Sequence, residues 1–229
     1  SGEVGTLSFA SGGQQLANLT MNRSGFGVVG FNLGSALSIH GTLSWTNGNS
    51  GHIRLGGNDL TIATGGSILT GNCSASSMIV PNGLGQLIHS IPGGISSNTD
   101  FIYPIGDITG FVQYSPLRLR VHSTSASPSV RLVGSRVVDG RHPADNPLNP
   151  NYLTRYWPMS CNTTAGSWSI TPYLTYITGS DTDVNGTEAF LHINQYDPGA
   201  ALWTQYTSTM FSPNLNTTSP LNQPDLLLS

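Results

Sequence analysis

The chain has 229 residues, of which 37% are hydrophobic, and this is enough to form a substantial core. Only 8% of the residues are charged, all eight basic residues are arginine, and the net charge is −3. This balance argues against binding to nucleic acid or to an anionic membrane surface, because both need clustered basic side chains. The longest apolar runs are far shorter than the ~20 residues of a membrane-spanning helix, so we also expect no membrane insertion.

The first part of the chain consists of short runs in which apolar and polar residues alternate. Apolar residues separated by one position recur between glycine- and asparagine-rich turns, in the pairs Leu19/Met21, Val29/Phe31, Leu37/Ile39, Leu43/Trp45, Ile53/Leu55 and Leu60/Ile62. Such alternation predicts β-strands. Every second pair recurs about every 14 to 18 residues, which predicts coils stacked as in a parallel β-helix.

Glycines separate these pairs. We expect them at corners where φ is positive or where the backbones of neighbouring coils approach closely. They are Gly30, Gly34, Gly41, Gly48, Gly51, Gly56, Gly57, Gly65 and Gly66. An antiparallel meander with tight turns, such as one at Asn47-Gly48, is the alternative arrangement. Both arrangements are all-β.

From about Ser76 the strands become longer and more aromatic. We expect strands at 78–80, 86–90, 101–105, 117–122, 129–138, 152–160, 167–177, 188–196 and 202–206. Alternation is cleanest at 117–121, where Leu and Val would face inward and Arg outward, and it also occurs at 190–193. Many strands separated by Gly, Pro and Asn turns predict an antiparallel β-sandwich. The expected organisation is a β-helix-like part at 1–75, a β-sandwich at 76–211 and a Pro/Asn/Ser-rich extension at 212–229.

Two cysteines, Cys73 and Cys161, are candidates for one disulfide. A bridge across so long a loop would stabilise the fold by roughly 4–5 kcal/mol on the chain-entropy model. The alternative is a pair of unrelated buried thiols. The low charge and the abundance of small polar residues are typical of an extracellular protein, where disulfides persist.

The sharpest local motif is SDTDVNGTE at 180–188. Asp181, Asp183 and Asn185 stand at alternate positions before a glycine, as in the first half of a calcium-binding loop, and Glu188 could complete the cage. An EF-hand-type loop would need a bidentate carboxylate where His192 stands. Asp, Asn and Gly are also ordinary turn residues, so a solvated hairpin tip is the alternative to a calcium site.

Catalytic chemistry has few candidate residues. Residues 1–75 contain only four charged side chains, which leaves little for an active site on the β-helical part. The densest cluster of charges comprises Arg136, Asp139, Arg141, His142 and Asp145. A loop laced by exposed ion pairs, each worth under about 1 kcal/mol, explains this cluster better than catalysis does. We therefore expect no enzymatic activity.

Aromatic residues near the last strands could form a carbohydrate platform. Trp203, Tyr206, Tyr173 and Tyr176 are the candidates, because aromatic faces on a sheet pack against sugar rings. Packing in the core is the alternative explanation for most of them.

Several motifs together resemble a family of cell-surface proteins. These are the Gly/Asn/Leu-rich segment at 41–62, YPIGD at 103–107 followed by YSP at 114–116, and RYW at 155–157. Their order resembles a module of large surface proteins that Bacteroidota export by the type IX secretion route. The similarity covers about residues 35–205 and lacks the C-terminal sorting domain of the large members, so we expect an excerpt or a processed form.

The resemblance implies an extracellular, surface-exposed, non-catalytic role. We expect a structural or adhesive subunit that assembles with copies of itself into a filament or array, or with adjacent modules of a large adhesin. The alternative is a carbohydrate-binding module of a larger secreted protein, with glycans as partners. Calcium is the one cofactor for which the sequence offers ligands.

Overall fold

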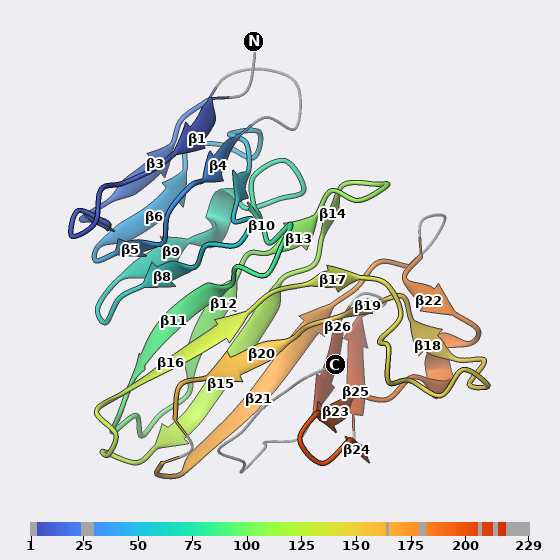
Figure 1. The fold of residues 1–229 in the computed structure, drawn as a ribbon. Coiled ribbons are helices and arrows are strands. Elements are labelled where there is room, and N and C mark those ends of the chain that lie inside the picture. The colour runs from blue at the N-terminus through green and yellow to red at the C-terminus, as the bar shows by residue number, and fades with distance from the viewer. Residues whose placement is uncertain are drawn as a thin grey trace.

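The computed structural model describes residues 4–23, 30–163, 165–178, 182–205, 208–212 and 215–218; for the last two segments it describes only the backbone. The protein is all-β, with stacked parallel coils that form a β-solenoid of about three turns, followed by antiparallel sheets (Figure 1). This confirms the fold class predicted from the alternation of apolar residues.

The solenoid has three faces, and each coil contributes one strand to each face. The first face contains β1 (Gly5–Leu7), β4 (Phe31–Leu33), β7 (Ile53–Arg54) and β10 (Ile79–Val80). The second contains β2 (Gln15–Leu16), β5 (Leu37–Ile39), β8 (Leu60–Ile62) and the start of β11 (Leu87–Pro92). The third contains β3 (Leu19–Met21), β6 (Thr42–Trp45) and β9 (Ser67–Leu69), after which comes the 3-10 turn η1 (Thr70–Asn72).

The coil repeat is longer than the sequence pattern predicted. Leu37 lies opposite Leu60, and Leu43 lies opposite Ile68, so one coil takes roughly 25 residues. Val29 lies outside the described residues. The described members of the apolar pairs lie in strands or directly after them, as predicted, but each pair lies beside the third pair along the chain and not the second. The reason is that the coils are three-sided, so that consecutive pairs occupy three faces instead of two.

One sheet joins the solenoid to the sandwich. Residues Leu87 to His89 of β11 pair in parallel with β8, and the whole of β11 pairs antiparallel with β16 (Val130–Ser135), which in turn pairs with β20 (Met159–Cys161). The second face of the solenoid therefore continues as a six-stranded sheet in the order β2-β5-β8-β11-β16-β20. The strands β10 and the start of β11 come after the predicted boundary at residue 75, yet they pair with the solenoid strands β7 and β8.

The second sheet of the sandwich has five strands. In spatial order they are β12 (Thr99–Tyr103), β15 (Leu117–Thr124), β21 (Trp168–Thr175), β26 (Leu215–Thr218) and β25 (Ser208–Ser212). In β15 the leucines and Val121 are buried and the two arginines point outward, as predicted. Because β26 pairs with β21, the predicted boundary at residue 212 cuts through this sheet.

Four short two-stranded ladders complete the described part of the fold. They pair β13 (Gly106–Asp107) with β14 (Gln113–Tyr114), β17 (Val138–Asp139) with β19 (Arg155–Tyr156), β18 (Tyr152–Leu153) with β22 (Val184–Asn185), and β23 (Asn194–Asp197) with β24 (Leu202–Gln205). One of them, β13 with β14, lies beside β10 of the solenoid (Figure 1). The strand predicted at 188–196 is instead the 3-10 turn η2 (Glu188–Phe190) followed by β23. Within 190–193 only Ile193 is buried.

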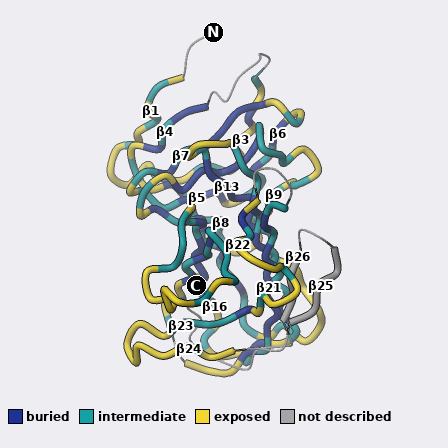
Figure 2. The backbone as a smooth tube through the Cα atoms, turned by 90° about the vertical axis from the view of Figure 1, so that its right-hand side faces the viewer, coloured by how far each residue is buried: buried dark blue, intermediate teal, exposed yellow. Residues whose placement is uncertain are grey.

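A single hydrophobic core runs through both parts of the molecule. It extends from Met21 and Phe31 in the solenoid to Tyr176 and Ile193 in the sandwich. Figure 2 shows buried backbone along the inside of both parts, whereas β23 is mostly half-buried and β24 is largely exposed. The two 3-10 turns are single turns, and no helix in the described segments has the length and apolar character to cross a membrane.

The close stacking of neighbouring coils leaves no room for a side chain at Gly30. A Cβ atom at this position would overlap the carbonyl oxygen of His52 on the neighbouring coil, because the backbones touch there. We expect Gly30→Ala to lower the free energy of unfolding by about 1–3 kcal/mol in urea titrations. Gly57→Ala is the control, since a Cβ there meets no atom within 4 Å. Equal losses in both variants would contradict this explanation.

Candidate functional site

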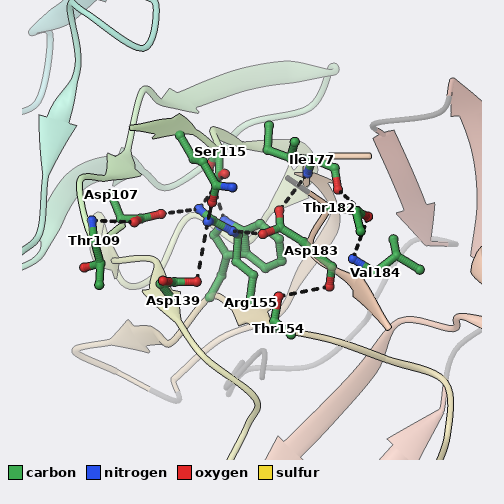
Figure 3. Close-up of polar contacts among 12 residues, drawn as sticks. Asp107, Thr109, Ser115, Asp139, Thr154, Arg155, Ile177, Thr182, Asp183 and Val184 are labelled. Atoms are coloured by element: carbon green, nitrogen blue, oxygen red, sulfur yellow. Dashed lines mark hydrogen bonds and ion pairs between the residues drawn. The ribbon is translucent and has the colours of Figure 1, made fainter. Parts of the chain in front are cut away.

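Arg155 in β19 lies at the centre of a buried ionic network. Its side chain is completely shielded from solvent, and its Nη1 lies 2.6 Å from Asp107 Oδ2 in β13 (Figure 3). Its Nε lies 3.1 Å from Asp183 Oδ1, just before β22, and its Nη2 lies 3.8 Å from Asp139 Oδ1 in β17. One guanidinium group therefore faces three carboxylates from three separate segments.

Neutral groups hold the same arginine from the β14 side. Arg155 donates from Nη1 to Ser115 Oγ at 2.7 Å and from Nη2 to Gln113 Oε1. The neighbouring Trp157 donates from its indole N–H to the carbonyl oxygen of Ser115 at 3.1 Å. The YPIGD, YSP and RYW motifs, which are far apart in the sequence, thus meet at one place.

Backbone donors orient two of the carboxylates. The amide of Thr109 donates to Asp107 Oδ1 at 3.0 Å, and the amide of Ile177 donates to Asp183 Oδ2 at 2.7 Å (Figure 3). Burial raises the pKa of Asp107, and this effect outweighs the lowering by Arg155. The network therefore fixes the ends of several short ladders, and its arginine is needed to balance buried negative charge.

A cavity of about 460 Å³ lies beside this network. Its floor consists of buried side chains, namely Arg155, Trp157, Leu174, Tyr176 and Ile193. One wall is the loop at 141–151, and the other is formed by residues 190–194 together with Trp203 and Gln205 of β24. The volume is within the range of small-molecule sites.

Arg141 organises the 141–151 loop. Its Nε donates to Asp145 Oδ2 at 2.8 Å, and its Nη2 donates to the carbonyl oxygens of Asn146 and Asn149. Its guanidinium carbon also lies 3.8 Å from the centre of the Tyr152 ring, a cation–π contact. These contacts give a proline-rich loop a defined shape over the cavity.

Four rings form an aromatic cluster at the edge of the cavity. His142 contacts Tyr156, Tyr196 and Trp203, with ring centres 4.8–5.0 Å apart. The indole N–H of Trp203 donates to the carbonyl oxygen of Ala144 at 3.1 Å, and the amide of Ala144 donates to His142 Nδ1 at 3.1 Å. Burial lowers the pKa of His142. Because Nδ1 accepts the amide N–H of Ala144, the neutral form of the ring carries its proton on Nε2.

The structure separates the four predicted sugar-binding aromatics. Trp203 and Tyr176 both line the cavity, although Tyr176 is fully buried and donates its hydroxyl proton to Glu188 Oε1 at 2.8 Å. Tyr173 lies on the other face of β21, where Arg118 stacks on its ring at 3.8 Å. Tyr206 lies outside the described residues.

The predicted calcium ligands make other contacts. Asp183 turns inward to Arg155, Asn185 donates to the carbonyl oxygen of Pro150 at 2.9 Å, and Glu188 accepts from Tyr176. Asp181 lies outside the described residues. Among the described residues, no group of three or more His, Cys, Asp or Glu side chains is arranged to hold a metal ion. Asp183 is buried in an ion pair instead of solvated at a hairpin tip, and β22 pairs with β18 and not with β21, so the structure does not show the predicted hairpin either.

A calcium requirement can be tested directly. Asp183 is already paired with Arg155 and is not available to a metal ion. We therefore expect the melting temperature to be the same in about 5 mM EDTA as in millimolar calcium. Differential scanning calorimetry on the full chain measures this. A calcium-dependent rise of several degrees would show that the SDTDVNGTE segment binds the ion after all.

The predicted disulfide is absent. Cys73 follows η1 beside the third face of the solenoid, whereas Cys161 ends β20 at the edge of the six-stranded sheet. Both are thiols, and Cys161 Sγ donates to the carbonyl oxygen of Thr163 at 3.2 Å. Burial raises the pKa of Cys73 to about 12, so it has little thiolate character. The prediction failed because residue spacing carries no information on which faces the two cysteines occupy.

The charged residues at 136–145 make two separate sets of contacts. Asp139 joins the Arg155 network, and Arg141 and Asp145 form the ion pair that shapes the loop, as the alternative to catalysis predicted. Sequence reasoning missed Arg155 and Asp107 as partners. Their signal was present, because both are charged residues inside motifs that carried the family resemblance.

Comparison of the chain with protein-family models, with curated proteins and with solved structures finds no match. The similarity to type IX-secreted surface proteins therefore stays a prediction based on motif order.

Proposed function

We propose that the chain is a non-enzymatic structural or adhesive module of an extracellular cell-surface protein. The six-stranded sheet carries this proposal, because it passes from the solenoid into the sandwich through β11. A load applied to either part is shared by the hydrogen bonds of a single sheet and by one continuous core. This is an architecture suited to bearing force and presenting surface.

The distribution of charge supports a role without catalysis. The carboxylates of Asp107, Asp139 and Asp183 all face Arg155, and Asp145 pairs with Arg141. A general acid or base needs a titratable group that can reach a substrate. Carboxylates held in ion pairs serve the fold instead.

The first coil supports assembly with copies of the chain or with adjacent modules. Within the described part of the chain, β1, β2 and β3 each pair with a strand on one side only. Exposed strand edges are templates for pairing unless charged residues, lysine above all, protect them. These three strands carry no charged residue, and the whole chain has no lysine.

The resemblance to surface proteins of Bacteroidota supports a location outside the cell. Protease treatment of intact producing cells, followed by mass spectrometry, tests this location. We expect peptides of the chain to be released without lysis. Recovery of the protein only from the cytoplasm of lysed cells would contradict the proposal.

Assembly is tested by light scattering and negative-stain microscopy of the purified protein. We expect filaments, sheets or defined multimers that weaken when Thr6→Lys adds a charge to the exposed side of the edge strand β1. Asn32→Lys in β4, which is paired on both sides, is the control. Release of reducing ends from a panel of polysaccharides would contradict the non-enzymatic part of the proposal.

A further inference from the structure

The charged side chains that line the cavity beside Arg155 are all held in ion pairs. Asp145 is paired with Arg141, and Arg155 on the floor faces Asp107 and Asp183. A free anion would find no unpaired cation here, and a free cation would find no unpaired carboxylate. The lining therefore favours a neutral ligand.

Three asparagine side chains on the 141–151 loop can donate further hydrogen bonds. Asn146, Asn149 and Asn151 each accept a backbone N–H with the side-chain oxygen, at 2.7–3.0 Å. These contacts fix which end of each amide is oxygen. The three amide nitrogens have no hydrogen-bond partner among the residues that the structure describes. All three residues line the cavity.

The opposite wall supplies an acceptor. Asn194 donates its side-chain nitrogen to the carbonyl oxygen of His192 at 3.1 Å, which leaves its side-chain oxygen available. Donors on one wall and an acceptor on the other match groups that both give and receive hydrogen bonds. Hydroxyl groups do both.

Aromatic rings complete the lining. Trp203 and Tyr156 border the cavity, and the hydrogen bond from Trp203 to Ala144 holds the indole in one orientation. A fixed aromatic face binds an apolar ring surface with little loss of side-chain entropy. A sugar ring presents such a surface on its C–H face and hydroxyl groups around its edge.

We propose that this cavity binds one residue of a neutral carbohydrate, with Trp203 packing against the ring and the amides of Asn146, Asn149 and Asn151 contacting its hydroxyl groups. This inference does not depend on the proposed structural role. It makes the protein a surface module with a glycan-binding site at the end of the sandwich remote from the solenoid's first coil (Figure 1).

Ligand-observed NMR with the full chain provides the first test. The probes are glucose, galactose, mannose and N-acetylglucosamine with their disaccharides, an acidic sialylated trisaccharide, and an uncharged peptide of similar size. We expect saturable binding of at least one neutral sugar. Binding of only the acidic sugar or only the peptide, or of no probe at millimolar concentration, would overturn the proposal.

Variants then locate the site. Asn149→Asp keeps the oxygen that accepts the amide of Asn151 but removes the free donor, so we expect the Kd for the bound sugar to rise about tenfold. Trp203→Ala should raise the Kd by at least about tenfold. Tyr173→Ala, on the other face of β21, is the matched aromatic control and should leave the Kd unchanged.

Circular dichroism spectra confirm that each variant is folded before titration. Asn149→Asp retains the backbone contact, so it remains informative if Trp203→Ala disturbs the loop. A Kd that is unchanged in both cavity variants, or that rises equally in Tyr173→Ala, would place the sugar elsewhere and overturn the proposal.

Discussion

Replacement of Arg155 by methionine is expected to lower the free energy of unfolding by about 3–5 kcal/mol. Methionine has about the same length as the aliphatic part of arginine but carries no charge. The substitution therefore leaves Asp107 and Asp183 buried without a compensating charge. Urea denaturation of the full chain, followed by tryptophan fluorescence, measures the loss. Trp157, two positions after Arg155 in the chain, is buried and reports on the same region.

A surface ion pair in the same protein provides the matched control. Arg120 forms a bidentate pair with Asp100, at 2.7 and 2.8 Å, and both side chains remain about one-third exposed. Arg120→Ala should cost under about 1 kcal/mol. Adding Asp183→Asn to Arg155→Met should recover part of the loss, because one uncompensated charge is removed. Equal losses for the two arginines would contradict a special role for Arg155.

The loss caused by Arg155→Met should also depend on pH. Arg155 lowers the pKa of Asp107, so its removal raises a pKa that burial has already raised. A carboxyl group whose pKa is higher in the folded chain stabilises the fold at low pH and loses this effect as pH rises through the folded-state pKa. The difference between wild type and variant should therefore shrink as the pH falls from 7 towards 4.

His89 is expected to make the wild-type fold sensitive to acid. Its ring lies between the two sheets of the sandwich, contacts the rings of Phe101 and Tyr103, and donates from Nε2 to the carbonyl oxygen of Ile102 at 2.9 Å. Burial lowers the pKa of His89 to about 4. As the pH falls below about 6.5, His89 becomes protonated in the unfolded chain but stays neutral in the folded chain. The free energy of unfolding therefore decreases between about pH 6.5 and 4. The expected loss is about 3 kcal/mol.

The variant His89→Gln isolates this contribution. Glutamine keeps an N–H donor for Ile102 but does not titrate, so its free energy of unfolding should change less over this pH range. His40→Gln, at an exposed position, should keep the wild-type pH dependence. Burial also lowers the pKa of His52, which adds a loss of the same sign and is common to all three proteins. A wild-type slope retained in His89→Gln would refute the assignment.

The elements of the solenoid could be predicted because strand patterning is local. In the segment around Leu37 and Ile39, two buried side chains flank one that is half-buried, and β8 in the next coil repeats this pattern. The coil repeat was not predictable in the same way. Two-sided and three-sided coils use identical apolar pairs, and only the register, such as Leu37 opposite Leu60, distinguishes them.

The predicted site residues show the same division. From the sequence, Asp183 is one of several possible oxygen ligands in a turn. In the structure its carboxylate faces Arg155, which is 28 positions earlier in the chain. The pairing of β18 with β22 and of β17 with β19 brings the two residues together. Trp203 was recognised as an aromatic residue near a late strand. That it faces a cavity together with the asparagines of the 141–151 loop depends on how β23 and β24 fold back over that loop.

The amino-acid sequence by itself determined that this protein is built from strands and that its charge is low, because apolar alternation is local and charge follows from composition. From the low charge it predicts that nucleic acid and membranes are poor partners. Only the tertiary structure decided that β11 joins solenoid and sandwich, that the cysteines lie apart, and that Arg155 gathers three carboxylates. Those facts depend on contacts between residues far apart in the chain. Whether a charge is buried and which strands pair depend on the complete fold.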